Sequence, residues 1–352
     1  MTVYVWAFVI AFAITFAITP LIKRLAIQIG AVDKPDARKV HHGMMPRLGG
    51  LAIFIGYMAS VLYTVQDVKS ILGLVLGSIV LVGVGIWDDV KQIGPKTKLT
   101  GQIIAAVIVV LFGNQVEFIT NPWGHLWYLG YLGVPLTIFW IVGFTNIVNL
   151  IDGLDGLAAG ISLISCLAIF TLLLQMGQVD LACIALALAG AAGGFLKYNF
   201  NPAKIFMGDT GSMLLGYTMA TISVMGAVKT AATISLVVPI VVLGLPILDT
   251  TFAIIRRKIN GRPVFKPDKG HVHHRLLALG LSQKQAVLLM YAVTAALGYV
   301  AILLAKVNWL VGVALVAAIL CVCVFIATKL GMIAKDEDIN KEKTAPSNQH
   351  DA

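Results

Sequence analysis

Six aspartates lie where the sequence leaves or enters an apolar run, and together they are typical of a site for a hard metal ion. They are Asp88, Asp89, Asp152, Asp155, Asp209 and Asp249. Converging carboxylates repel one another and need a cation, and oxygen ligands suit Mg²⁺ or Mn²⁺ rather than Zn²⁺. Mg²⁺ usually binds one or two carboxylates together with substrate phosphates. The aspartates therefore indicate phosphoryl chemistry, although for each one alone a helix cap or a pair with a nearby lysine is an open alternative.

Glycines and basic residues accompany these aspartates. Asp209 lies in the string GDTGS at the start of an expected helix, whose N-terminus favours an anion. Lys98 follows Asp89 by nine positions, and the string HVHHR at residues 271–275 brings three imidazoles and a guanidinium together. Arginine can bind a diphosphate through two hydrogen bonds, and histidine can donate to it as well. A metal cluster and a solvated basic loop are the alternatives for this histidine segment.

The elements that position these residues must be membrane spans, because the composition excludes a soluble enzyme. Of the 352 residues, 59% are hydrophobic and 12% are charged, and the mean hydropathy is +0.90. A soluble domain is roughly 45–50% apolar and about 25% charged. The same composition excludes a disordered chain and a collagen-like fibre. We therefore expect an all-α, polytopic membrane protein.

Eleven apolar runs are separated by polar breaks, and most approach the length of about 20 residues that a spanning helix needs. Their approximate bounds are 3–22, 49–65, 70–86, 99–115, 131–148, 157–176, 180–197, 211–228, 231–252, 285–304 and 309–328. We expect residues 1–334 to form one transmembrane domain and residues 335–352 to form a polar cytoplasmic tail.

The basic residues predict the orientation of these spans. The net charge is +9, from 26 Lys and Arg against 17 Asp and Glu. If the N-terminus is outside, 23 of the 26 basic residues are on the inner side, and only Lys69, Lys229 and Lys306 are outside. This asymmetry is the positive-inside pattern, so the surplus charge needs no nucleic acid to explain it. An odd number of spans then puts the C-terminus and all six aspartates at the cytoplasmic face.

Six strings, in this order, resemble motifs of the polyprenyl-phosphate N-acetylhexosamine-1-phosphate transferases, or glycosyltransferase family 4. They are RKVHHGMMPRLGGLAIF, WDDVKQIGPKTKLTGQ, NIVNLIDGLDGLAAG, FNPAKIFMGDTGSMLLGY, PILDTTFAIIRR and DKGHVHHRLLALGLS, between about residues 38 and 282. The string PRLGG and the eleven expected spans favour the bacterial undecaprenyl-phosphate GlcNAc-1-phosphate transferases, which begin teichoic-acid linkage units or O-antigen chains. The related phospho-MurNAc-pentapeptide transferase usually has PTMGG and ten spans.

The resemblance implies a role for each matching residue. It implies catalytic roles for Asp88, Asp89 and Lys98, and metal binding by Asp209 and Asp155. It implies substrate binding by Asn149, Asp152, Asn199, Phe206, His271, His273, His274 and Arg275. Phe206 is expected to stack on uracil, with plain packing as the alternative, and for Asn199 the alternative is a helix cap. Arg47, with Arg38 and Lys39, is a candidate contact for the phosphate of the lipid, or a general attraction to anionic lipids.

The implied reaction joins a lipid phosphate to a phospho-sugar. Undecaprenyl phosphate attacks the β-phosphorus of UDP-GlcNAc, UMP leaves, and Mg²⁺, or Mn²⁺ in its place, assists. A phosphate monoester is largely a dianion at pH 7, so the cations should matter more than a general base. Asp88 and Asp89 are expected either to accept the remaining proton or to organise Lys98 and the waters of the metal.

Other functions remain as alternatives. UDP-MurNAc-pentapeptide or another UDP-HexNAc is the alternative donor within the same chemistry. A secondary transporter is the remote alternative, because transporters bind near the bilayer midplane, whereas these aspartates gather at one face. The expected partners are UDP-GlcNAc, undecaprenyl phosphate and the lipid bilayer, with a homodimer left open and no nucleic acid.

Overall fold

The apolar runs form helices, as backbone groups in a lipid environment must be satisfied within the chain. The computed structural model describes residues 2–33, 44–120, 125–230, 234–261, 270–307 and 309–329. The helices within this part are α1 (Thr2–Gln28), α2 (Gly49–Thr64), α3 (Leu72–Lys91), α4 (Pro95–Leu111), α5 (Gly133–Ile151), α6 (Leu157–Gln175), α7 (Val179–Asn199), α8 (Gly208–Thr230), α9 (Ile234–Val242), α10 (Gly244–Ile259), α11 (Val272–Ala278), α12 (Gln283–Leu304) and α13 (Trp309–Lys329).

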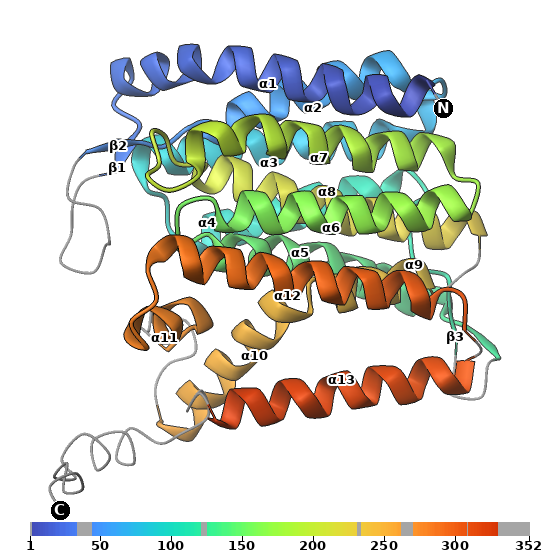
Figure 1. Ribbon diagram of the computed structural model, residues 1–352. Coiled ribbons are helices and arrows are strands. Elements are labelled where there is room, and N and C mark those ends of the chain that lie inside the picture. Colours follow the sequence, from blue (N-terminus) through green and yellow to red (C-terminus); the bar gives the residue numbers. More distant parts are fainter. Residues whose placement is uncertain are drawn as a thin grey trace, which may run out of the picture.

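Short elements connect some of these helices. Two 3-10 helices, η1 (Val68–Ile71) and η2 (Gly130–Leu132), lead into α3 and α5. Two antiparallel pairs of strands occur, β1 (Val32–Asp33) with β2 (Met45–Pro46) and β3 (Phe118–Thr120) with β4 (Leu126–Tyr128). The pair β1–β2 and helix α11 lie at one end of the bundle, and the N-terminus and β3 lie at the other (Figure 1).

The helices agree with the expectation of a multi-pass, all-α membrane protein. Seven of the described helices are long and apolar enough to cross a membrane, and α2 is shorter, with 16 residues. The single span expected over 231–252 is broken, because α9 and α10 meet at an angle of 73°. Pro246, in the first turn of α10, has no N–H to donate to a carbonyl of α9, which accounts for the break. The count of eleven spans and their orientation stay predictions, and the tail 335–352 lies outside the described residues.

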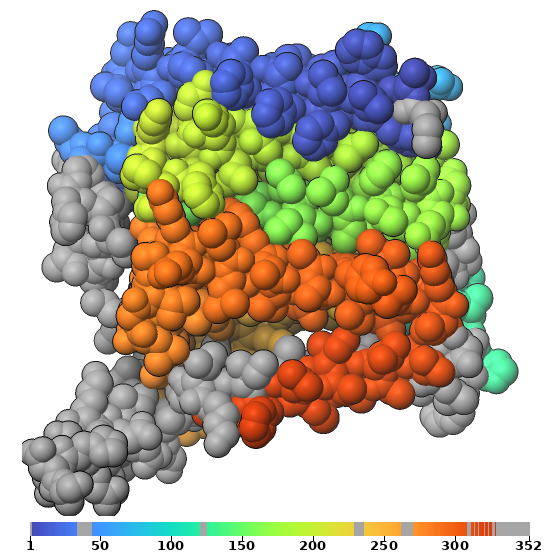
Figure 2. Space-filling view, viewed as in Figure 1, coloured from blue at the N-terminus to red at the C-terminus, as the bar shows by residue number. Residues whose placement is uncertain are grey.

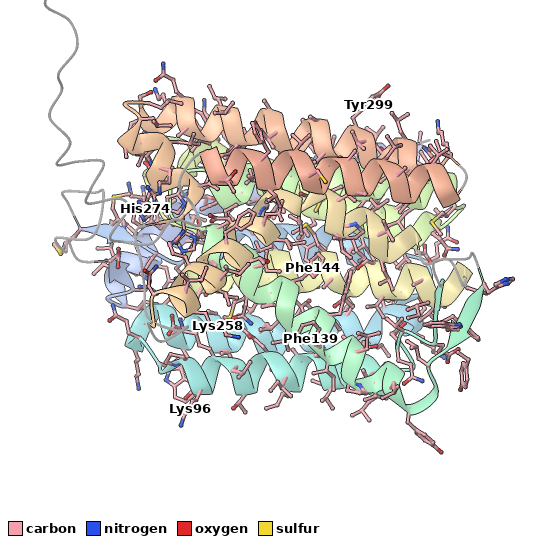
Figure 3. All side chains as sticks on the ribbon, turned by 90° about the horizontal axis from the view of Figure 1, so that it is seen from below. Lys96, Phe139, Phe144, Lys258, His274 and Tyr299 are labelled. Carbon is pink, nitrogen blue, oxygen red and sulfur yellow. The ribbon has the colours of Figure 1, made fainter. Side chains whose placement is uncertain are left out.

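The outer face of the bundle is apolar, as a surface in contact with lipid must be. Helices α1, α7, α6 and α12 follow one another across the face seen in Figure 2. Large apolar side chains on this set of helices are exposed, among them Trp6, Phe16, Leu167 and Tyr299. Figure 3 shows Tyr299 pointing away from the bundle.

Helix α8 forms the centre of the bundle, and its start is held by close backbone contacts. Nearly all of its side chains are buried, and it packs against α3, α5, α2 and α9. A Cβ on Gly50 of α2 would overlap the backbone of Gly211, and one on Gly85 of α3 would overlap Thr210. Small residues allow helices in membranes to approach this closely. The first turn of α8, which carries Asp209, is therefore fixed against α2 and α3.

Candidate active site

A long-range backbone pairing brings the chain before α2 to the start of α8. Phe206 N donates to Pro46 O at 2.8 Å, and Gly49 N donates back to Phe206 O at 3.0 Å. Gly50 N continues the pairing to Met207 O at 2.8 Å. Because Arg47 lies inside this paired segment, its side chain is placed beside the first turn of α8. No pattern in the sequence indicated this pairing, since the two segments are far apart in the chain.

Asp89 accepts hydrogen bonds from two other parts of the chain at once. Its side chain is fully buried at the end of α3. It accepts from Asp209 N at 2.9 Å, Thr210 N at 3.1 Å and Thr210 Oγ1 at 2.6 Å. It also accepts from Arg47 Nε at 3.2 Å and Arg47 Nη2 at 3.0 Å. A carboxylate offers about four lone-pair sites, so five donors occupy Asp89 completely. Asp89 thus caps the N-terminus of α8 from a neighbouring helix.

Gly208 is required where this cap meets α8. Its φ is 71°, and a Cβ would overlap the carboxylate of Asp89. The left-handed conformation costs a residue with a Cβ roughly 1–2 kcal/mol, and the displaced carboxylate adds to this cost. We expect Gly208→Ala to lower the thermal unfolding midpoint in detergent, whereas Gly83→Ala, whose Cβ would meet nothing within 4 Å, serves as the control. Equal midpoints for the two variants would contradict this account of Gly208.

Asp88 and Asp209 share one lysine. Lys98 Nζ lies 3.0 Å from Asp88 Oδ2 and also contacts Asp209 Oδ2. The side chain of Asp209 is 19% exposed and that of Asp88 is 3% exposed, so Asp209 is the more open of the two. Lys98 thus neutralises a close pair of carboxylates that would otherwise repel each other.

The side chain of Arg47 also forms ion pairs with carboxylates. Its guanidinium contacts Asp89, lies 3.4 Å from Asp88 Oδ2 through Nη2, and lies 3.5 Å from Asp33 Oδ1 through Nη1. Such a paired guanidinium holds the carboxylates in place. The structure therefore places Arg47 as a residue that orients Asp89, and its contact with a lipid phosphate stays a prediction. Arg38 and Lys39 lie outside the described residues.

The donor set of this cluster suits Mg²⁺. Among the residues that the structure describes, Asp88, Asp89 and Asp209 are the group whose ligand atoms all lie within 4.8 Å of one another. Because Asp89 is fully occupied, Asp88 and Asp209 are the two that could turn toward a cation. Two carboxylates combined with phosphate oxygens and water are the ligands that Mg²⁺ prefers.

The loop between α5 and α6 carries the two other aspartates of the motif, and their surroundings differ. Asp152 is half-buried, and burial together with the negative charges of Asp209 and Asp89 raises its pKa to about 7. Asp155 instead accepts hydrogen bonds from Asn201 Nδ2 and Ala203 N, both at 3.0 Å. Asp155 therefore shapes the segment that leads to α8 and lies outside the carboxylate cluster, not beside Asp209 as we expected for a metal ligand.

The two asparagines of the motifs fix the same region. Asn149 Nδ2 donates to Ser212 Oγ at 2.8 Å, in the first turns of α8. Asn199 Oδ1 accepts from Gly156 N, and its Nδ2 donates to Ile205 O, both at 3.0 Å. Asn199 is 3% exposed and its amide joins the start of α6 to the segment before α8, so a substrate contact for it stays a prediction. The side chain of Phe206 is half-buried beside these residues, so a stacking role for it stays a prediction.

The histidine segment packs against the same loop. The rings of His271 and His273 are parallel, with centroids 5.8 Å apart, and the ring of His274 is 4.2 Å from His273. His273 lies against Gly153, where a Cβ would be 2.8 Å from its Nε2. Arg275 is half-buried on α11 next to these rings. Figure 3 shows His274 toward the same end of the bundle as Lys258 and Lys96. The structure thus brings the histidines to the loop of Asp152.

His273 gives the stability of the protein a pH dependence of definite sign. Burial, helped by the neighbouring His274, lowers the pKa of His273 to about 4. A histidine in an unfolded chain titrates near about pH 6.5, so below that value the unfolded state binds a proton that the folded state does not. We expect the unfolding midpoint to fall between pH 7 and pH 5, and to fall less in His273→Gln. The exposed His125, replaced by Gln, is the control, and an unchanged slope in His273→Gln would contradict a buried neutral ring.

Comparison with known proteins places the chain in a family. The sequence profile of glycosyl transferase family 4 matches residues 71–227. A Bacillus subtilis protein named "Probable undecaprenyl-phosphate N-acetylglucosaminyl 1-phosphate transferase" is 43% identical over 289 residues, which are 82% of this chain and 81% of that protein. The chain belongs to glycosyl transferase family 4.

The names of other relatives also contain a polyprenyl phosphate. The undecaprenyl-phosphate alpha-N-acetylglucosaminyl 1-phosphate transferase of Haemophilus influenzae is 34% identical over 292 residues, 80% of this chain and 82% of that protein. The decaprenyl-phosphate N-acetylglucosaminephosphotransferase of Mycobacterium tuberculosis is 36% identical over 301 residues, 77% of this chain and 74% of that protein.

The sequence did not single out two residues that complete the site of this family 4 protein. Thr210 donates twice to Asp89, and Asp33 pairs with Arg47. Thr210 belongs to the string GDTGS, so a helix-start pattern could have suggested a capping role for it. Asp33 carries no such signal, because only the pairing of β1 with β2 brings it to Arg47.

Proposed function

We propose that the protein transfers GlcNAc-1-phosphate from UDP-GlcNAc to undecaprenyl phosphate, giving undecaprenyl-diphospho-GlcNAc and UMP. The observation that carries the proposal is the cluster of Asp88, Asp209 and Lys98 at the first turn of α8, at one end of a bundle with an apolar outer face. Such a cluster suits a charged diphosphate, and the apolar face suits a polyprenyl tail. The 43% identity to the Bacillus subtilis protein supports the same donor and acceptor.

Asp209 and Asp88 would hold the Mg²⁺ ion. When bound, the ion neutralises charge on the oxygens of the diphosphate. Asp89 would support binding of the ion by fixing the backbone at Asp209 and Thr210, so that the Asp209 side chain keeps its direction. Lys98, which pairs with both ligand carboxylates here, then has its ammonium close to the phosphates of the donor.

The remaining task of the protein is to bring two anions together. Phosphoryl transfer depends mostly on positioning and on charge stabilisation. The lipid phosphate is already largely ionised at pH 7, so little proton removal is needed. Asp89 is a poor proton acceptor here, since its lone pairs are occupied by Arg47 and α8, and Asp88 would be a ligand of the ion.

We propose that the site faces the cytoplasm, in the cell membrane, in the first membrane step of teichoic-acid or other envelope polysaccharide synthesis. The distribution of basic residues supports this orientation. A charged nucleotide sugar cannot cross lipid and a polyprenyl tail cannot leave it, so they can meet only at the inner interface.

Release of UMP tests the proposal. Purified protein with Mg²⁺, undecaprenyl phosphate and UDP-GlcNAc should release UMP, EDTA should stop the release, and added Mg²⁺ should restore it. UDP-MurNAc-pentapeptide and UDP-GalNAc, assayed in parallel, should be poorer donors. A better rate with UDP-MurNAc-pentapeptide would replace the proposed donor, and no UMP from any donor would overturn the proposal in favour of a transporter.

A further inference from the structure

Asp249 ties the histidine segment to α10 through both of its carboxylate oxygens. Its side chain is 3% exposed. Oδ2 lies 2.9 Å from His271 Nδ1, and Oδ1 accepts from Val272 N at 2.7 Å. Figure 1 shows α11 at the end of the bundle, below α12 and next to α10. One buried carboxylate therefore sets both the backbone at the start of α11 and the ring of His271.

The chemistry of the pair also decides which nitrogen of His271 carries a proton. An ionised carboxylate only accepts hydrogen bonds, so the nitrogen that faces it must be the donor. His271 Nδ1 is therefore protonated, and in the neutral ring the lone pair is on Nε2. An Asn in place of Asp249 cannot accept from both His271 Nδ1 and Val272 N without placing its amide N–H against a donor.

Through the ring of His271, Asp249 influences the loop between α5 and α6, which lies beside the cluster of acidic residues. The ring of His271 is parallel to that of His273, which rests on Gly153 in the loop that carries Asp152. Asn149, just before this loop, donates to Ser212 in the first turns of α8 at 2.8 Å, so the loop borders the cluster. Tilting the ring of His271 would therefore shift His273 against this loop.

We propose that Asp249 is a positioning residue of the transferase site, which holds His271 in its Nδ1-protonated form and thereby sets the histidine segment for the nucleotide sugar. This inference rests on the proposed function. It assigns Asp249 no contact with substrate and no part in metal binding. The lipid phosphate is expected to be insensitive to it, since the histidine segment serves the donor.

Asp249→Asn is the decisive variant. We expect kcat/KM for UDP-GlcNAc to fall at least tenfold, chiefly through KM, while KM for undecaprenyl phosphate changes less than twofold. Nitrogen NMR of protein labelled in its histidines, with the His271 signals assigned by their loss in His271→Asn, should show Nδ1 protonated in the wild type and a changed protonation pattern in Asp249→Asn. Asp67→Asn is the matched control, because Asp67 is exposed and Asn caps a helix equally well.

The same substitution, made in a protein that carries His271→Asn, distinguishes a positioning role of Asp249 from general damage to the fold. In His271→Asn the side-chain amide nitrogen takes the place of Nδ1 and can still donate to Asp249. In the double variant the two amides can pair by turning over, so Asp249→Asn should cost less than twofold in this background. Equal losses in both backgrounds, or a His271 signal unchanged by Asp249→Asn, would overturn the proposal. The NMR measurement needs no turnover, so it tests Asp249 even if the wild type releases no UMP.

Discussion

Asp209→Asn should abolish Mg²⁺-dependent release of UMP, with a loss of about a thousandfold or more. Asp209 is the most exposed carboxylate of the cluster, and the backbone contacts of Asp89 fix its direction. An amide lacks the negative charge that binds Mg²⁺, and it cannot balance the ammonium of Lys98. A thousandfold loss corresponds to about 4 kcal/mol in the activation barrier, a normal scale for removing a metal from phosphoryl transfer.

The measurement is UMP release as a function of Mg²⁺ concentration, with melting temperature as the check on folding. Asp180→Asn, in the first turn of α7 and at the other end of that helix from Asn199, is the control and should behave as the wild type. Near-normal turnover by Asp209→Asn at ordinary Mg²⁺ concentration would remove Asp209 as a metal ligand.

Asp89→Asn should lose both stability and activity, whereas Asp88→Asn should lose mainly activity. The carboxylate of Asp89 is fully buried and accepts from Arg47, Asp209 and Thr210. An amide has one oxygen, so its NH₂ group would face Arg47 or the N-terminus of α8. Breaking a buried charged pair by removing one partner costs about 3–5 kcal/mol.

Unfolding in detergent, followed with UMP release on the same samples, checks this difference. Asp88 is the natural comparison, because it is adjacent in the chain, and its carboxylate pairs with Lys98 at 3.0 Å and with Arg47 at 3.4 Å. If Asp89→Asn unfolds at the same temperature as Asp88→Asn, Asp89 does not hold α8 as we describe.

The sequence was sufficient for the parts of the fold that follow from local patterns. Hydropathy predicted long apolar helices, and the aspartates that end α3 and begin α8 were expected to converge, as the structure has them. The break between α9 and α10 was not expected, because the run 231–252 is apolar throughout, and the effect of the missing N–H of Pro246 does not show in the hydropathy.

Residues whose partners are distant in the chain could not be predicted in the same way. Asp155 was expected beside Asp209, but Asn201 and Ala203 hold it. The contacts of Arg47 with Asp89 were not expected either, and the pairing of its segment with Phe206 places it there. In both cases a motif gave the residue type and the region correctly, and long-range backbone contacts decided what each side chain meets.

In the proposed reaction, the β-phosphorus of the donor moves with the sugar to the lipid. UDP-GlcNAc with radioactive phosphorus in the β-phosphate tests this directly, with Mg²⁺, undecaprenyl phosphate and the purified protein. We expect the label to pass into the lipid fraction in an amount equal to the unlabelled UMP released, and we expect Asp209→Asn to transfer none. Label in released UDP, or label that stays in the donor while the lipid remains unchanged, would contradict it.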